Sequence, residues 1–520
     1  MNIVIKICDI IGIVITVLVL YKGVFAAIGL FKVKHFKKTE NKHKYAICVA
    51  ARNERNVIKN LLESILNQDY PLDKLAVLVC PNNCTDDTAD ICREFAKEHP
   101  ELQIYVYERQ CNEERTKGYA LRYLFDQVKN GFEGGVNAFE GYFIFDADNV
   151  LKQDYVTRMN EAFDSGNKII TSFRNSKNMH QNWISYGYAM HWMRTCLTEN
   201  RAKAILDQAC RVQGTGFLFS NELVQNGWNY LTLTEDRSFC TDAVIQNYKI
   251  SYVEDAVFYD EQPYNLKVAL RQRLRWSKGH LLSAVENCPK LMKNMFNPKK
   301  NFFIQYDCFW LNFPYSIESG ARKIIKWSMQ IAIAIIASNF VGWLKAFAIS
   351  YLLGLASTWL SNIFVEILVL ITYRKDISAI EKPKFWKSVF HVLMFPFFDI
   401  IGKWTSYIAL FKKIEWKPIP HDTVVDISKL DDEPSNEEKA ENDIQVEYVV
   451  EPVQEDAKGE ANMETIEENV NLIENETKED VVAENIKQET NAENAWHKPL
   501  QLAGVLLFFA IAKHILILTK

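Results

Sequence analysis

The sequence of 520 residues predicts an α/β domain with a mostly parallel central sheet, combined with α-helices long and apolar enough to cross a membrane. Two observations support this fold class. Short apolar runs alternate with amphipathic stretches between residues 45 and 145, and longer apolar runs lie on both sides of this region.

Four short apolar runs predict buried strands: 45-YAICVAA-51, 76-AVLVC-80, 104-IYVY-107 and 142-YFIF-145. Between them, residues 57–66 and 88–99 place their apolar side chains at helical spacing. Strand–helix alternation favours an open parallel sheet, in which ligands bind beyond the carboxyl ends of the strands. We therefore expect the functional site at that edge of the sheet.

Four longer apolar runs predict membrane helices. They are Ile7–Phe31, a hairpin made of Trp327–Leu344 and Ala346–Tyr373, and Leu500–Leu518. A fifth run, Val389–Phe411, contains Pro396 and is expected either to span the membrane or to re-enter it. For the first run, a buried core helix is the alternative.

Positive residues around these runs predict a multi-pass protein of the cell membrane with its α/β domain in the cytoplasm. Five segments follow from the pattern. They are an N-terminal transmembrane helix (1–38), the α/β domain (39–290), interfacial and transmembrane helices (291–421), an acidic disordered linker (422–496) and a C-terminal hydrophobic helix (497–520).

Charge is distributed unevenly along the chain. Residues 431–494 contain 22 acidic residues, 4 lysines and one aromatic residue, a composition that favours disorder. This tail is a candidate contact for a partner or a second copy of the chain, and no nucleic-acid partner is expected. The eleven cysteines show no disulfide or zinc-binding spacing, which indicates reduced thiols.

Polar residues follow the predicted strands, in 51-ARNERN-56, 80-CPNNCTDDT-88 and 146-DAD-148. Two aspartates separated by one residue at a strand end direct their carboxylates toward a common point. Hard divalent cations such as Mg²⁺ or Mn²⁺ prefer such oxygen ligands, and the cation would bridge to a diphosphate. The alternative for Asp146 and Asp148 is an ordinary turn or helix cap.

A basic stretch, 271-RQRLRWSKGH-280, carries three residues on one helical face. Gln272, Arg275 and Trp276 stand at positions i, i+3 and i+4, so they can grip one ligand together. Arg271 and Lys278 fall on other faces, and we expect them to meet anionic lipid. An amphipathic interfacial helix anchored by its tryptophan is the alternative for the whole stretch.

Seven motifs occur in one order: ARNE, NNCTDDT, KGYAL, DAD, QGTG, TED and QRLRW. In this order they resemble the membrane-integrated family 2 glycosyltransferases, and are similar to cellulose, chitin and hyaluronan synthases of the processive bacterial type. The resemblance covers residues 45–280 and extends more loosely to 421, where 416-WKPIPH-421 looks like a closing motif. It implies a GT-A-like fold for the α/β domain and hexosyltransferase activity.

The resemblance implies how the nucleotide sugar, a UDP-sugar, would be bound. Glu54 would lie near uracil, and Asn82 stands where family members usually have an aspartate for the base. An amide still pairs with the imide edge of uracil. Lys117 would approach the diphosphate, Asp146 the ribose, and Asp148 would hold Mg²⁺ or Mn²⁺. A solvated lysine at the start of a helix is the alternative for Lys117.

The resemblance also implies the reacting groups. Asp236 would be the base that deprotonates the acceptor hydroxyl, and Glu235 would orient or cap. Arg275 would stabilise charge on the leaving diphosphate, because a guanidinium group donates several hydrogen bonds in one plane. Trp276 would stack on the acceptor sugar, with Gln272 hydrogen-bonding nearby. For Glu235 and Asp236, capping of the helix predicted to follow is a compatible second role.

The implied reaction is the inverting transfer of sugar from a UDP-sugar to a growing β-linked polysaccharide. Two alternatives remain open at this point. One is the addition of a single sugar to a lipid or short glycan without processivity. The other is a membrane scaffold with weak catalysis, whose acidic tail recruits partners.

Overall fold

The computed structural model describes residues 21–111, 113–312, 340–378, 384–414, 419 and 421–430. These residues all belong to one compact unit, Val19–Glu433. The acidic segment 431–494, the apolar run Leu500–Leu518 and most of the runs Ile7–Phe31 and Trp327–Leu344 lie outside the described residues.

An eight-stranded sheet forms the centre of the protein, in the order β3-β2-β1-β4-β7-β6-β8-β5. The strands are β1 (Tyr45–Ala51), β2 (Leu75–Pro81), β3 (Gln103–Val106), β4 (Gly141–Asp146), β5 (Val150–Leu151), β6 (Ile169–Ser176), β7 (Phe217–Ser220) and β8 (Ser251–Asp260). All four strands predicted from the sequence are present. Four of the seven pairings are parallel, but β7 runs antiparallel to both its neighbours and β5 antiparallel to β8. The sheet is therefore more mixed than its first half suggests.

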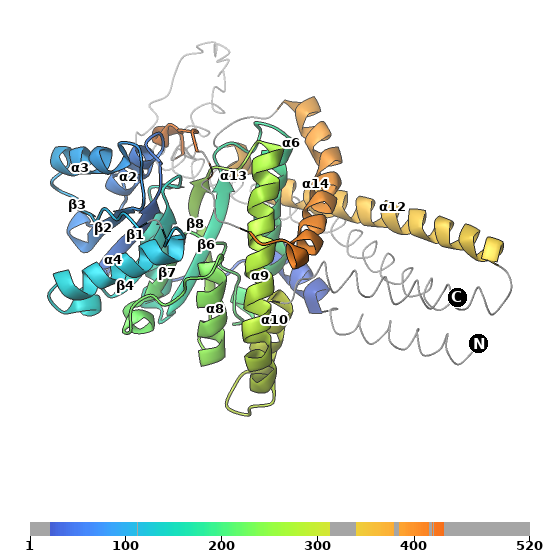
Figure 1. Cartoon of the computed structure of the whole chain (residues 1–520), viewed down its shortest axis with the longest axis horizontal. Helices are drawn as coiled ribbons and strands as arrows, with labels where there is room; N and C mark the ends of the chain where they lie inside the picture. Colours follow the sequence, from blue (N-terminus) through green and yellow to red (C-terminus); the bar gives the residue numbers. More distant parts are fainter. Residues whose placement is uncertain are drawn as a thin grey trace, which may run out of the picture. The chain divides into compact units, whose positions relative to one another are not determined.

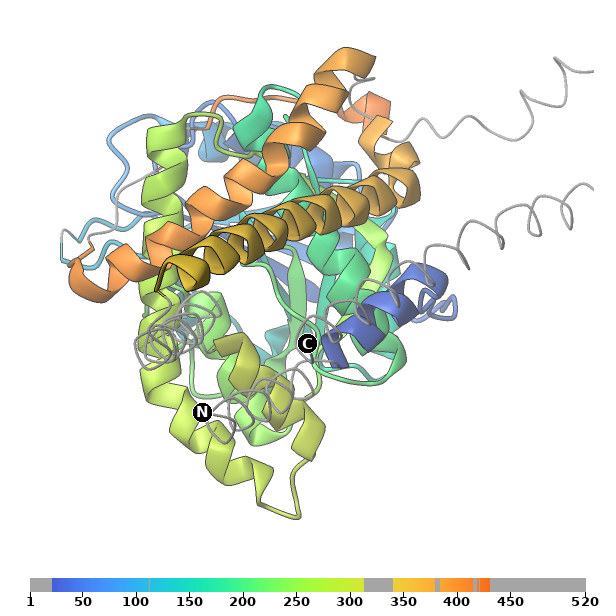
Figure 2. The ribbon, with the colours of Figure 1, turned by 90° about the vertical axis from the view of Figure 1, so that its right-hand side faces the viewer.

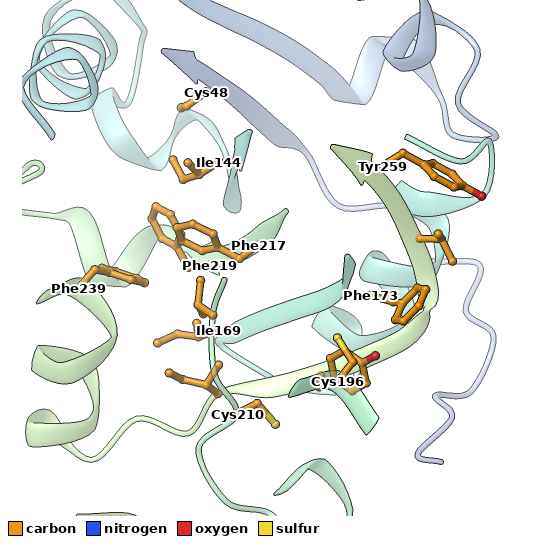
Figure 3. Close-up of a cluster of buried hydrophobic side chains, with 14 of the residues drawn as sticks. Cys48, Ile144, Ile169, Phe173, Cys196, Cys210, Phe217, Phe219, Phe239 and Tyr259 are labelled. Carbon is orange, nitrogen blue, oxygen red and sulfur yellow. The ribbon is translucent and has the colours of Figure 1, made fainter. Parts of the chain in front are cut away.

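Both faces of the sheet are buried, which explains the continuous apolar strands. In β1, Ala46 and Cys48 pack into one core, while Tyr45, Ile47 and Val49 pack into the core on the other face. Figure 3 shows part of the first core, where aromatic rings such as Phe217, Phe219 and Phe239 gather beside Ile144 and Ile169.

Helices cover each core. Helices α2 (Ile58–Leu66), α3 (Thr88–Glu98) and α5 (Tyr155–Asp164) contribute to one core, and α4 (Lys117–Gly131), α6 (Trp183–Thr195) and α8 (Glu235–Gln246) contribute to the other. A π-helical turn, Cys196–Asn200, and the short α7 (Arg201–Ile205) continue α6. Figure 1 shows α2 and α3 beside β2 and β3.

The chain then becomes helical. The remaining helices are α9 (Leu266–Met295), α10 (Phe302–Asn312), α12 (Phe340–Thr372), α13 (Arg374–Ser378) and α14 (Phe385–Phe411). Helix α9 contacts both α10 and α14, and α14 also contacts α6 and α12. Figure 2 shows α12 and α14 crossing on the same side of the sheet domain. Since α9 passes through residue 290, the sheet domain and the helices that follow share this helix.

Two of the described helices are long and apolar enough to cross a membrane, over Phe347–Thr372 and Phe385–Phe411. The expected hairpin turn near Lys345 is wrong, because α12 passes through this position without a break. A single lysine in an otherwise apolar stretch carries good helix propensity and does not end a helix. Helix α14 is also continuous although it contains Pro396.

The contact between α6 and α14 leaves no room for a side chain at Gly187. A Cβ atom there would lie 2.4 Å from Cγ of Phe398. We expect Gly187→Ala to lower the melting temperature of the purified protein, with a loss of about 1–3 kcal/mol from overpacking. Gly354→Ala in α12 is the matched control, since a Cβ atom at Gly354 meets nothing within 4 Å. Equal melting temperatures for the two variants would show that α6 and α14 are not packed this tightly.

Candidate active site

A cavity of about 770 Å³ opens at the carboxyl ends of the parallel strands β1, β2 and β4. All the residues singled out from the sequence lie on its wall. They are Glu54, Asn82, Lys117, Asp146, Asp148, Glu235, Asp236, Gln272, Arg275 and Trp276. The site therefore lies where the sheet-edge rule places it.

Lys117 opens helix α4 and points into the site. Its Nζ lies 2.5 Å from Oδ1 of Asp146 and 3.1 Å from the carbonyl oxygen of Gly214. Burial lowers the pKa of Lys117, but the neighbouring Asp146 and Glu235 outweigh it, so the pKa is raised overall. The lysine is therefore a fixed cation beside Asp146, and the alternative of a solvated lysine is wrong.

The start of α4 is placed by a close approach of two backbones. A Cβ atom at Gly118 would lie 2.3 Å from the carbonyl oxygen of Tyr230. Glycine is therefore required at this position to bring the first turn of α4, and Lys117 with it, against the loop that leads to Asp236.

Asp148 is almost fully buried, and its carboxylate is held by neighbouring donors. Oδ2 accepts from the backbone N–H of Glu261 at 3.0 Å, and Oδ1 accepts from Asn149 at 3.3 Å. Burial raises the pKa of Asp148, but His421 and Lys177 outweigh this effect and hold the pKa below its usual value. Asp148 is therefore negatively charged and can bind a cation.

His421 stands between Glu54 and Asp148. Its Nδ1 lies 3.0 Å from Oε2 of Glu54, and its Nε2 lies 4.0 Å from Oδ2 of Asp148. Burial lowers the pKa of His421, but Asp148 and Glu54 outweigh it and raise the pKa to about 10. Burial raises the pKa of Glu54 to about 7, against the opposing effect of His421. No role was predicted for His421 from the sequence, although His421 is the last residue of the motif 416-WKPIPH-421.

The segment that carries His421 is strapped to the sheet domain. The backbone N–H groups of Asp422 and Thr423 donate to the Glu261 carboxylate at 3.0 and 2.8 Å. Lys177 donates to the carbonyl oxygen of Thr423 at 2.7 Å. Asn60 completes the attachment by exchanging two hydrogen bonds with the backbone of Val425. These contacts hold residues 421–425 over the edge of the cavity.

Asn82 continues the end of β2. Its Oδ1 accepts hydrogen bonds from Arg109 and from Asn83, each at 3.2 Å. The amide oxygen is thus oriented by two donors. An aspartate at this position would place a further negative charge beside Glu54 on the same wall, and the amide avoids that repulsion.

Glu235 and Asp236 form the first turn of α8, as expected of acidic residues at a helix start. Asp236 borders the turn at Gly214, where a Cβ atom would lie 3.7 Å from Oδ2 of the aspartate. Glu235 is buried, and burial raises its pKa to about 7 although Lys117 opposes this. Burial therefore favours the protonated form of Glu235.

Helix α9 presents the expected face to the cavity. Arg275 Nη1 donates to the carbonyl oxygen of Leu233 at 3.0 Å and so fixes the loop before Asp236. The Trp276 ring lies edge-on to Trp192 and Tyr188, with ring centres 5.5 and 5.8 Å apart. Gln272 lines the same wall.

The expectation that Lys278 meets anionic lipid is wrong. Its Nζ donates to the carbonyl oxygen of Ala409 in α14 at 3.0 Å. Lys278 therefore joins α9 to α14, because the exposed carbonyl groups near a helix end attract a cation.

The donor set for a metal consists of Asp146 and Asp148. Within the described ranges, no three carboxylate, histidine or cysteine side chains gather closely enough to hold a metal by themselves. Two carboxylates with hard oxygen atoms fit Mg²⁺ or Mn²⁺ when a diphosphate and water supply the other ligands. The site therefore fits a cation that arrives together with a diphosphate.

The cavity is also lined by a buried ion pair that was not predicted from the sequence. Arg174 pairs with Asp260 and lies over the Trp192 ring, 4.2 Å from its centre. Arg174 lies in β6 and Asp260 in β8, and neither strand carries a motif that marks these residues. Only the pairing of β6 with β8 brings them together.

Residues 43–279 match the family described as "Glycosyltransferase like family 2". A probable glycosyltransferase of Bacillus subtilis, YdaM, is 23% identical over 361 residues, which cover 64% of this chain and 79% of that protein. Beta-monoglucosyldiacylglycerol synthase of Nostoc sp. is 25% identical over 264 residues, 49% of this chain and 53% of that protein. Among solved structures, the mannosyltransferase PcManGT of Pyrobaculum calidifontis, in complex with GDP-Man and Mn²⁺, has a TM-score of 0.50 at 17% identity. The match covers 77% of this chain and 99% of that one, and it is a likeness of fold.

The buried Glu235 makes stability depend on pH. Its pKa rises from 4.5 to about 7 on folding, so the folded protein holds this proton more tightly than the unfolded chain. The cost of the buried charge is therefore absent below pH 4.5 and grows as the pH rises to 7. We expect Glu235→Gln to be more stable than wild type by about 1–3 kcal/mol at pH 8 and equal to it at pH 4. Denaturant unfolding at both pH values measures this difference.

The control for this prediction is Glu222→Gln, because Glu222 is exposed and its pairing with Lys168 lies at the surface. A stability gain for Glu235→Gln that persists unchanged at pH 4 would mean that packing, and not ionisation, sets the difference.

Proposed function

Because residues 43–279 form a family 2 glycosyltransferase domain with a GT-A-like fold, we propose that this protein transfers a sugar, with inversion, from a UDP-sugar to a hydroxyl group of a membrane-associated acceptor. One observation carries the proposal. Ten residues from six separate motifs line a single cavity at the carboxyl ends of the parallel strands.

The donor would occupy the half of the cavity nearest β1, β2 and β4. Glu54 and Asn82 offer hydrogen-bonding groups to the base, and Asn82 is held in place by Arg109. Lys117 is a buried cation beside Asp146, where a diphosphate would bring negative charge. When the donor enters, its diphosphate would compete with Asp146 for Lys117.

A divalent cation would be held by Asp148 and Asp146 and would neutralise charge on the diphosphate as it departs. His421 already supplies a positive charge 4.0 Å from Asp148 in this structure. A bound cation would therefore require His421 to shift from Asp148 or to contact the diphosphate instead, since like charges repel.

The reaction is a direct displacement at the anomeric carbon. Asp236 accepts the proton of the acceptor hydroxyl while the hydroxyl oxygen bonds to C1 of the sugar, and the bond between C1 and the diphosphate oxygen breaks. We assign this role to Asp236 because it borders the turn at Gly214 on the cavity wall, whereas Glu235 is buried. Arg275 stabilises the leaving diphosphate, and Glu235 orients Lys117.

The acceptor would lie against Trp276. This ring belongs to an aromatic wall with Trp192 and Tyr188, and an apolar ring face suits the flat face of a sugar. Gln272 stands one helical turn away and offers its amide to a hydroxyl group.

Two acceptors are supported by different observations. The combination of TED with QRLRW is typical of polymerising synthases and favours a growing β-linked polysaccharide. The similarity to a relative named for making monoglucosyldiacylglycerol favours a single addition to a lipid. Separation of products by length on a gel distinguishes a polymer ladder from one added sugar.

The membrane assignment is part of the proposal. Helices α12 and α14 have the length and composition of membrane spans, and their outward side chains are apolar: Trp404 and Phe411 are 63% and 91% exposed. We propose that the sheet domain lies on the cytoplasmic side of the cell membrane, which the lysines after residue 31 favour.

The first test is UDP release by the purified full-length protein over a panel of UDP-sugars with Mn²⁺ or Mg²⁺. We expect turnover with one donor, and a loss of about 10²–10⁴-fold in Asp236→Asn, since a positioned base contributes this much. Asp242→Asn on the same helix is the control, because Asp242 contacts Tyr230 and Gln246 and does not line the cavity. Retained turnover in Asp236→Asn would remove Asp236 from the base role.

Metal dependence is tested separately. We expect EDTA to abolish sugar transfer and added Mn²⁺ or Mg²⁺ to restore it, because only two protein carboxylates and the diphosphate would hold the cation. Asp148→Asn should need a higher concentration of the same ion. Full activity in EDTA would show that Lys117, Arg275 and His421 are sufficient to neutralise the diphosphate.

A further inference from the structure

The wall of the same cavity includes a cationic region outside the ten residues described above. We call it the cationic chamber. It is lined by His191, Arg194, Arg211, Arg237, Arg273 and His280, which come from α6, the loop before β7, α8 and α9. Lys22 and Lys403 add two further cations, whereas Glu199 and Asp399 are the carboxylates beside them on this wall.

The arginines of this chamber are held mainly by neutral groups. Arg237 donates to the carbonyl oxygen of Leu311 at 2.7 Å, and Arg273 donates to that of Phe398 at 2.9 Å. Arg273 also lies over the Phe398 ring, 3.6 Å from its centre. Carbonyl groups and rings orient a guanidinium group without neutralising its charge. These arginines therefore keep their capacity to pair with an anion.

Arg211 is the strongest single indication. Its backbone is fixed by Asn200, which accepts from its N–H at 2.8 Å and donates to its carbonyl oxygen at 3.1 Å. Over the described ranges, its guanidinium group makes no hydrogen bond or ion pair. Its guanidinium group faces the cavity, and the carboxylate whose charge it affects, Glu199, is shared with Lys203, so the charge of Arg211 is only partly compensated.

The carboxylates do not balance this charge. Asp399 lies 2.7 Å from Lys403 and only 3.9 Å from Arg194, so one carboxylate is shared by two cations. Glu199 lies 3.8 Å from Lys203, a buried lysine that also pairs with Asp307. The cations on the wall of the chamber therefore outnumber the anions.

The cations of the chamber also affect the pKa of its two histidines. Burial, followed by Arg194, Arg211 and Arg273, holds the pKa of His191 well below its usual value. Burial, followed by Arg237 and Arg211, does the same to the pKa of His280. Both rings are therefore neutral and can donate one hydrogen bond to an anion without adding charge.

Local backbone features build this chamber. A Cβ atom at Gly402 would lie 1.9 Å from Nη1 of Arg273, so α14 needs glycine there for Arg273 to cross toward the Phe398 carbonyl. The π-helical turn Cys196–Asn200 interrupts the regular helix and places Thr198 and Glu199 on the wall. Turns of this kind frequently mark functional sites.

Helix α14 relates the chamber to the bilayer. Gly402, Lys403, Thr405 and Ser406 of α14 line the cavity, while Trp404, Ile408 and Phe411 of the same helix are exposed. A helix with a polar face on the cavity and an apolar face outward lies between the site and the lipid. This position favours an occupant that comes from the membrane.

We propose that the acceptor is a phospholipid whose headgroup carries a free hydroxyl, and that Arg211 and Arg237 bind its phosphate. This inference rests on the proposed function and names the acceptor for it. Asp236 and Arg237 both belong to α8 and both line the cavity, so the hydroxyl next to the bound phosphate would be presented to Asp236. The hydroxyl oxygen then bonds to C1 of the sugar, its proton passes to Asp236, the diphosphate leaves and the lipid phosphate is unchanged.

The test compares lipid binding by the purified full-length protein in detergent micelles. Native mass spectrometry measures the retention of phosphatidylglycerol and of diacylglycerol with the same acyl chains. We expect phosphatidylglycerol to be retained preferentially, and about tenfold more weakly by Arg211→Gln and by Arg237→Gln, because each removes a charge-assisted hydrogen bond. Arg93→Gln is the matched control, since Arg93 pairs with Asp90 and Glu108 at the surface.

Kinetics provide the second measurement. We expect both chamber variants to raise the KM for phosphatidylglycerol about tenfold while the KM for the nucleotide sugar stays unchanged. Arg211→Lys should recover part of the loss, because a lysine keeps the charge but not the planar geometry.

Three outcomes would overturn the inference. They are equal retention of phosphatidylglycerol and diacylglycerol, unchanged binding in both chamber variants, and glycerol phosphate binding as tightly as the lipid, which would make free phosphate the ligand. Transfer to a soluble oligosaccharide alone would also overturn it. Selective retention of phosphatidylglycerol without UDP release from any donor would instead count against the proposed function and leave the phosphate-binding chamber in place.

Discussion

Helix α9 has to satisfy two partners at once, and the arrangement of the site depends on this constraint. Through Arg275 it holds the carbonyl group of Leu233, in the loop that ends at the α8 carboxylates. Through Arg273 and Lys278 it holds the carbonyl groups of Phe398 and Ala409 in α14. A single helix thus joins the sheet domain, which carries the proposed donor-binding residues, to the apolar helix α14.

The charges of the cavity divide along the same line. At the strand ends, carboxylates predominate and are matched by single cations, Lys117 on Asp146 and His421 between Glu54 and Asp148. In the cationic chamber, cations predominate, and two of them, Arg237 and Arg273, donate to backbone carbonyl groups. The proposed reaction would join two anionic molecules, a nucleotide sugar and a phospholipid, and would therefore require charge compensation on both sides of the reacting carbon. The two groups of residues would supply it by different means.

Residues 421–425, which follow the apolar helices in the chain, are attached to the sheet domain near the end of β1. They attach to α2 through Asn60 and, through Glu261, to the chain directly after β8, and they place His421 against Glu54. The last described segment of the chain therefore completes a site that begins at residue 54.

The sequence by itself predicted four of the eight strands, β1 to β4, and ten residues that line the cavity. Apolar runs of the right length can only be buried in a two-sided sheet, so β1 to β4 were predicted to within two residues, and polar residues at their ends had to meet at one edge. The helical spacing of Gln272, Arg275 and Trp276 likewise fixed the face of α9. Long-range pairing decided the rest. His421 lies 367 residues from Glu54 in the chain, yet the two side chains are in contact. No local pattern in the sequence distinguishes Arg211, which lines the cavity, from an arginine at the surface. The boundary between two helices that was expected near Lys345 lies within one continuous helix. These features depend on which elements become neighbours in space, and local spacing carries no information about that.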